Sequence, residues 1–104
     1  MDYRVEKLIS GLQYHKVAVY GTGINAERVI KGMKTLDSCS IVGVLDGALR
    51  SGEYEGNKII SMEELLSLHP EAIIAAAQLA SALAIYHRIH QICREHQIAL
   101  LDMW

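Results

Sequence analysis

The sequence has no phenylalanine, one tryptophan, one proline and two cysteines in 104 residues. Two cysteines are too few for a domain held together by several disulfides, and free thiols are typical of a reducing compartment. The ten lysines and arginines are spread along the chain, so the basic patch of a nucleic-acid-binding protein is missing. No apolar run approaches the roughly 18 residues of a membrane span, and charged residues near the start exclude a signal peptide. We therefore expect a cytoplasmic protein without a membrane span or a nucleic-acid partner.

Aliphatic residues are abundant instead, because hydrophobic residues make up 51% of the chain and aromatic residues only 6%. A chain of this length is large enough to form one hydrophobic core. Runs of valine and isoleucine are typical of strands that are buried on both faces of a parallel sheet. We interpret residues 1–104 as a single domain. We expect it to be a module of a longer protein, because a dinucleotide-binding fold normally continues past this point.

The spacing of hydrophobic residues alternates between the periods of helices and strands. It predicts helices over 3–13, 24–36, 61–69 and 80–97, and strands over 16–20, 41–45, 58–60, 72–76 and 98–103. This alternation predicts an α/β fold of Rossmann type, with an open, parallel, five-stranded sheet in the order 3-2-1-4-5 and helices on both faces. The segment 46–57 is the least regular, and we expect a mobile loop there.

The same spacing predicts which side chains form the core. Ser61 and Glu64 have the spacing of a capping box, which places the start of the third helix. In the strands and helices we expect the following residues to be buried: Val17, Val19, Ile30, Val42, Val44, Ile74 and Ile89. We expect the inner side of the last helix to carry Ala82, Ile85, Tyr86, Ile89 and Cys93.

A glycine-rich turn, residues 21–26 (GTGINA), follows the first predicted strand and opens the next helix. This context is the one that the dinucleotide-binding pattern G-x-G-x-x-G/A requires. Gly21 permits a tight turn, Gly23 lets the backbone approach a diphosphate, and Ala26 allows close helix–strand packing. The free N–H groups and the dipole of the helix favour a phosphate at its start. We expect the phosphates of a ligand to contact Gly21, Thr22, Gly23, Ile24 and Asn25.

Asp46 ends the second predicted strand, about 20 residues beyond the glycines, where dinucleotide-binding folds place an acid. A carboxylate there accepts hydrogen bonds from ribose hydroxyls and repels a 2′-phosphate. On this interpretation the ligand is NAD or another nucleotide with a free ribose, rather than NADP. The alternative is that Asp46 only starts a turn with Gly47.

The carboxyl ends of the first and fourth predicted strands form the crevice in which open α/β sheets bind ligands. Ala77, Gln78 and Ser81 lie at the start of the last helix, so we expect them to face the glycine turn across this crevice. Gln78 has the amide needed to hydrogen-bond a base or a sugar. It is equally well explained as a solvated loop residue.

Two further patterns do not predict chemistry. Tyr54 and Lys58 have the Tyr-x-x-x-Lys spacing of short-chain dehydrogenases, but they span a glycine-containing loop rather than a helix, so we interpret the spacing as coincidence. His87 and His90 share a helix face without a further converging ligand, and a metal site would need one. We therefore predict neither a catalytic residue nor a metal ligand.

Three segments, 16–23 (KVAVYGTG), 41–46 (IVGVLD) and 56–65 (GNKIISMEEL), resemble small Rossmann domains of bacterial cell-surface polysaccharide biosynthesis proteins. These include the N-terminal domains of sugar-nucleotide acetyltransferases and domains that precede nucleotide-sugar dehydratases and dehydrogenases. The resemblance to the acetyltransferases implies that Gly21, Gly23 and Asp46 hold a UDP-sugar. Catalysis in the acetyltransferases belongs to a following β-helix that this sequence lacks. CoA-binding domains share the same outline.

Three functions are therefore open. The first is a nucleotide-binding module of a polysaccharide biosynthesis protein, without catalytic residues of its own, which we favour because the glycine turn and Asp46 occur in register. The second is the cofactor-binding half of an NAD-dependent oxidoreductase. The third is a Rossmann scaffold that serves association with a second copy or an adjoining domain.

Overall fold

A parallel sheet of four strands forms the centre of the computed structural model, which describes residues 3–104. All three strand pairs are parallel. The apolar run before Gly21 forms a central strand, in which every residue after Lys16 is buried. Across the sheet the strands follow the order β2 (Ser40–Leu45), β1 (Lys16–Tyr20), β5 (Ala72–Ala75) and β6 (Ala99–Asp102).

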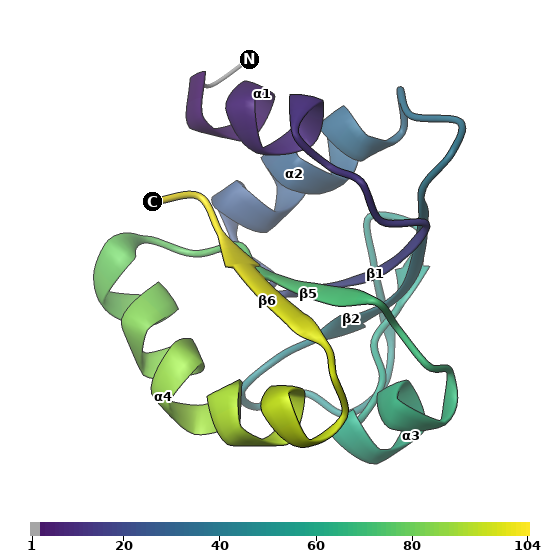
Figure 1. Ribbon diagram of the computed structural model, residues 1–104, viewed down its shortest axis with the longest axis vertical. Coiled ribbons are helices and arrows are strands. Elements are labelled where there is room, and N and C mark those ends of the chain that lie inside the picture. Colours follow the sequence, from purple (N-terminus) through teal and green to yellow (C-terminus); the bar gives the residue numbers. More distant parts are fainter. Residues whose placement is uncertain (1–2) are drawn as a thin grey trace.

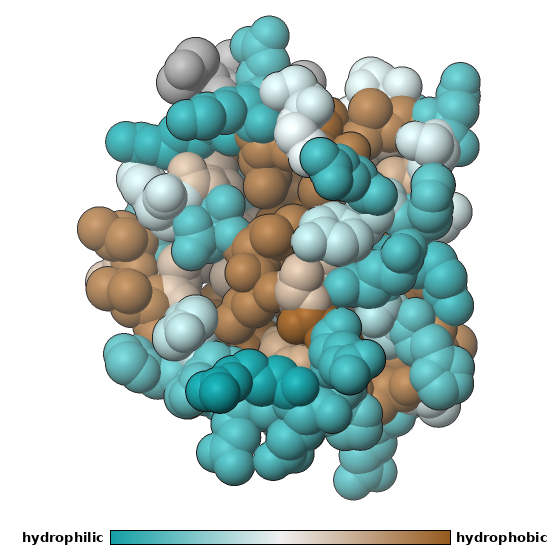
Figure 2. All heavy atoms as spheres, viewed as in Figure 1, coloured by the Kyte–Doolittle hydropathy of each residue, from teal (hydrophilic) through white to brown (hydrophobic). Residues whose placement is uncertain are grey.

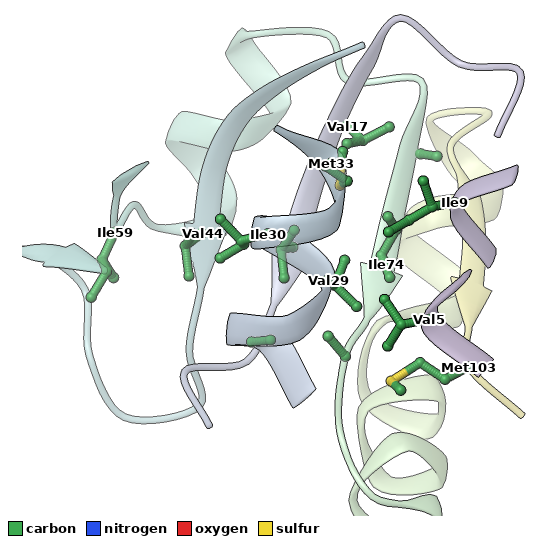
Figure 3. Packing of buried hydrophobic residues seen from close by; sticks show 14 residues of the cluster. Val5, Ile9, Val17, Val29, Ile30, Met33, Val44, Ile59, Ile74 and Met103 are labelled. Carbon is green, nitrogen blue, oxygen red and sulfur yellow. The ribbon is translucent and has the colours of Figure 1, made fainter. Parts of the chain in front are cut away.

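Helices cover both faces of this sheet (Figure 1), as the sequence predicts. One face is covered by α1 (Tyr3–Ser10) and α2 (Ile24–Met33), and the other by α3 (Met62–Ser67) and α4 (Leu79–Glu95). Successive strand residues point to opposite faces of the sheet, so each strand contributes side chains to two hydrophobic cores, one on each face. Figure 3 shows the first core, in which Val5 and Ile9 of α1 lie over Ile74 of β5.

The prediction of a fifth strand over 58–60 is wrong, because this segment does not form a regular strand of the parallel sheet. The chain instead forms an antiparallel hairpin of β3 (Glu53–Tyr54) and β4 (Asn57–Lys58), in a sheet of its own. Ile59 then makes a single parallel bridge with Val44 of β2. The segment is too short for more, because Ser61 already caps α3. The hairpin also replaces part of the irregular loop predicted over 46–57.

Other sequence predictions are confirmed in part. Ser61 Oγ accepts a hydrogen bond from the Glu64 N–H at 3.1 Å, as the capping box requires. The predicted core residues are buried except Val42, which is half-buried because β2 has no regular strand on its outer side. Tyr86, predicted on the inner side of α4, is 48% exposed and stacks on His90 instead. α1 and α2 each end three residues before the predicted boundary.

Candidate functional site

The glycine turn joins β1 to α2 at the carboxyl edge of the sheet. Gly21 has a φ of +132°, and its N–H donates to the carbonyl of Leu45 at 2.8 Å. A Cβ at Gly21 would lie only 2.7 Å from the carbonyl oxygen of Ala76, which follows β5. Both the backbone conformation and the close approach of this second segment therefore require glycine at position 21.

Gly23 is a glycine for a different reason. It is the N-cap of α2, with an ordinary φ of −100° and no side chain to cap the helix. A Cβ placed on it would meet nothing within 4 Å. The first N–H groups of a helix have no partner within the helix, and the helix dipole favours an anion there. The Cβ position of Gly23 is thus open at the end of α2 where the first N–H groups have no partner within the helix.

Thr22 and Asp46, which the sequence places 24 residues apart, are in direct contact. Thr22 Oγ1 donates to Asp46 Oδ1 at 2.7 Å. The other oxygen, Oδ2, accepts from the N–H groups of Ala48 at 2.8 Å and Leu49 at 2.9 Å. Asp46 therefore does start a turn, through the two hydrogen bonds to Oδ2. Its carboxylate can still accept a further hydrogen bond, because Oδ1 keeps a second lone pair for another donor, such as a ribose hydroxyl.

These contacts also give Asp46 an effect on stability that depends on pH. The N–H groups of Leu49 and Ala48, followed by the Thr22 hydroxyl, hold the pKa of the Asp46 carboxyl below its ordinary value. A carboxyl whose pKa is lowered on folding stabilises the fold above its unfolded pKa, about 3.9 for aspartate. This contribution is lost as the pH falls through the folded pKa.

We therefore expect Asp46→Asn to be less stable than the wild type at neutral pH, with the difference shrinking as the pH falls below about 4. Urea unfolding of both proteins across this range measures the difference directly. The pKa of Glu71 is also lowered, because its carboxylate accepts from the His15 and Lys16 N–H groups. Because Glu71 affects both proteins equally, the contribution of Asp46 is the difference between their free energies of unfolding at each pH. A difference that stays constant with pH would contradict the assignment.

Of the segment between β5 and α4, the residue that contacts the glycine turn is Ala76, which precedes the predicted residues Ala77, Gln78 and Ser81. Ala76 pairs with Tyr20 through its N–H at 3.0 Å and abuts Gly21 through its carbonyl. The Ala77 carbonyl accepts a hydrogen bond from the Trp104 indole at 2.9 Å. Gln78 is the exposed N-cap of α4, and its side chain makes no capping hydrogen bond. Ser81 is exposed as well, so a role for either side chain stays a prediction.

Tyr54 is a residue of the site that the sequence reasoning missed. Its hydroxyl donates to the Gly23 carbonyl at 2.7 Å, so the β3–β4 hairpin lies beside the glycine turn. Burial raises the pKa of this hydroxyl, and the nearby Glu27 adds to the effect. Lys58 of the Tyr-x-x-x-Lys spacing lies 3.7 Å from Glu64 instead. Gly52 and Gly56 flank Tyr54 with positive φ and were the available signal for a hairpin.

The site thus presents backbone N–H donors for an anion and one carboxylate acceptor. Among residues 3–104, no three histidine, cysteine, aspartate or glutamate side chains converge as metal ligands would. The two free cysteines lie elsewhere: Cys93 is buried on the inner side of α4, and Cys39 is half-buried directly before β2. The hydroxyls at the glycine turn, those of Thr22 and Tyr54, both donate hydrogen bonds within the protein, to Asp46 and to the Gly23 carbonyl.

A four-stranded parallel sheet, two covering layers of helices and a glycine turn define an α/β domain with its candidate site at the carboxyl edge of the strands. The chain belongs to the C2185-like N-terminal family, whose family model matches residues 13–98. The matched segment contains every element from β1 to α4 and includes both Gly21 and Asp46. No curated protein matches the chain. Within 3–104, the helices are too short or too polar to cross a bilayer.

Proposed function

We propose that this domain binds a nucleotide-bearing ligand, NAD or a nucleotide-sugar, at the glycine turn, as a non-catalytic module of a polysaccharide biosynthesis protein. The observation that carries the proposal is the open space beside Gly23 at the start of α2, with Asp46 one hydrogen bond away through Thr22. Backbone N–H donors for an anion and a carboxylate acceptor for a diol therefore lie next to each other. A nucleoside diphosphate carries the matching groups, a diphosphate and a ribose diol, next to each other.

In the proposed complex, each part of the ligand has a defined partner. The diphosphate accepts from the N–H groups of the glycine turn and the first turn of α2. The ribose hydroxyls donate to Asp46 Oδ1, beside the Thr22 hydroxyl. The β3–β4 hairpin, held to Gly23 by Tyr54, forms one wall of the site. Gln78 is available to the base or sugar, since its side chain does not cap α4.

The charge of Asp46 provides the test. Asp46→Asn keeps an oxygen for Thr22 but removes the charge. We expect it to weaken NAD or UDP-N-acetylglucosamine binding by about 1 kcal/mol or more, because hydrogen bonds to charged groups are the stronger ones. We expect NADP to gain relative to NAD in this variant, because a like charge has been removed. Isothermal titration of NAD, NADP, UDP-N-acetylglucosamine and CoA at one salt concentration measures these changes.

Asp37→Asn is the matched control, because Asp37 is exposed in the turn after α2 and should leave every affinity unchanged. If the wild type binds NADP as tightly as NAD, Asp46 is not at the ribose. If NAD binds and a companion domain completes a hydride-transfer site, the oxidoreductase function replaces the binding module.

Association with another chain is the second candidate, and one observation favours it. Leu79, Leu83 and Tyr86 recur at helical spacing on the outer side of α4, with about half of each side chain exposed. Figure 2 shows hydrophobic side chains gathered over the start of this helix, at the left of the view. If nothing in the ligand panel binds, and the protein forms a dimer that Leu83→Glu dissociates in sedimentation, association is the function.

A further inference from the structure

A second cavity lies between the start of α3 and the middle of α4, and Asp46 is the one residue of its lining that also belongs to the site at the glycine turn. Its volume is about 240 Å³. It opens on the face of the sheet opposite α2, and its walls are largely apolar, with Ile60, Ile89 and Ile92 among them. An apolar hollow of this size is larger than a water site and suits a compact organic group.

Arg88 of α4 is held at this cavity by a buried partner. One guanidinium nitrogen donates to the hydroxyl of Tyr20 at 3.1 Å, and Tyr20 is only 7% exposed. The same nitrogen passes close to Gly47, where a Cβ would lie 3.1 Å from it. The hydrogen bond to Tyr20 therefore positions the Arg88 side chain before any ligand binds, which lowers the entropy cost of binding.

Arg50 approaches the cavity from the segment after β2. Its guanidinium donates to the carbonyls of Asp46 at 3.1 Å and Leu49 at 3.2 Å. Within residues 3–104, neither Arg50 nor Arg88 forms a salt bridge, although the charge of Arg50 contributes to lowering the pKa of the Asp46 carboxyl. The one acid in the lining is Asp46, whose carboxylate already accepts from Thr22 and from two backbone N–H groups. Two arginines thus line an apolar hollow with most of their donors unused.

We propose that this cavity is a binding subsite for an organic oxyanion, namely a phosphate monoester or a carboxylate on a compact apolar group. The apolar group fills the hollow against Ile60, Ile89 and Ile92, and the oxyanion lies between Arg50 and Arg88. Guanidinium groups bind phosphate and carboxylate through paired N–H donors. No residue of the glycine turn lines the cavity, so the subsite needs no contact with Gly23, although the two sites share Asp46.

Titration calorimetry with three probes tests the subsite: inorganic phosphate, phenyl phosphate and benzoate. We expect phenyl phosphate to bind at least about tenfold more tightly than inorganic phosphate, because only the former fills the apolar walls. Comparison of phenyl phosphate with benzoate decides which oxyanion is preferred. In methyl-labelled protein, phenyl phosphate should shift the Ile60 and Ile89 resonances and leave Ile30, in the other core, unmoved.

Arg88→Gln should weaken phenyl phosphate binding about tenfold or more, the loss expected for hydrogen bonds to a charged group. Arg94→Gln is the matched control, because Arg94 is exposed on the same helix and does not line the cavity. Arg50→Gln provides a second variant on an exposed segment, with the same expected loss. Gly23→Val should leave phenyl phosphate affinity unchanged, which separates this subsite from the glycine turn. Absence of phenyl phosphate binding, or equal binding by Arg88→Gln, Arg50→Gln and wild type, would overturn the proposal.

Discussion

Gly21→Ala is expected to lower the free energy of unfolding by about 2–4 kcal/mol, combining backbone strain with a steric overlap. The φ of +132° at this position is one that side-chain-bearing residues rarely adopt. The added Cβ would also lie 2.7 Å from the Ala76 carbonyl oxygen. That oxygen belongs to backbone, and the Ala76 N–H is bonded to Tyr20, so it cannot move aside without loosening the sheet. Urea unfolding at neutral pH measures the loss.

Substitutions at two other glycines distinguish the effect of backbone strain from the effect of steric overlap. Gly56 has a φ of +78° with nothing within 4 Å of its Cβ position, so Gly56→Ala carries strain without overlap. Gly23 has neither, so Gly23→Ala should change stability by less than about 1 kcal/mol. The expected order of destabilisation is Gly21→Ala, then Gly56→Ala, then Gly23→Ala. Equal losses for the first two variants would show that the contact with Ala76 adds nothing.

Gly23→Val is expected to reduce nucleotide affinity about 100-fold or more, a loss near 2.7 kcal/mol. The branched side chain would occupy the open space in front of the α2 N–H groups, where we place the phosphates. Valine adopts the extended conformation of Gly23 without strain, and it costs the helix only about 1 kcal/mol as a poor N-cap. Titration calorimetry measures the affinity, and urea unfolding shows that the variant is folded.

The matched comparison is Gly23→Ala, whose single methyl group should weaken binding less than valine does. A graded loss along the series glycine, alanine, valine is expected for a ligand that approaches this backbone closely. If Gly23→Val binds the nucleotide as tightly as the wild type, the phosphates do not lie at the glycine turn. A loss of folding in this variant would contradict the open space found beside Gly23.

The sequence predicts the local parts of this fold well. β1 has the predicted bounds, because its apolar run is limited by a lysine at one end and by Gly21 at the other. The strand predicted over 58–60 was wrong as a regular strand, since a run of three residues carries no reliable period. The glycine turn and Asp46 were found from their spacing, and the structure brings Thr22 and Asp46 into contact.

Contacts between residues far apart in the sequence could not be predicted from local patterns. The Tyr54 hydroxyl meets Gly23 across 31 residues, and Arg88 meets Tyr20 across 68. Neither pair has a period or motif, because the contacts depend on how the hairpin and α4 pack on the finished sheet. The arginine-lined cavity could not be predicted for the same reason.

The position of β1 between β2 and β5 also sets the entropy of assembling the sheet. β1 and β2 are joined by a short crossover, and Thr22 and Asp46 at their ends are 24 residues apart. At the opposite edge, the Glu71 carboxylate accepts from the Lys16 N–H across 55 residues, just before β5. Closing the longer loop costs about 0.7 kcal/mol more chain entropy. In chain entropy, pairing of β1 with β2, which also forms the glycine turn between them, is therefore less costly than pairing of β1 with β5.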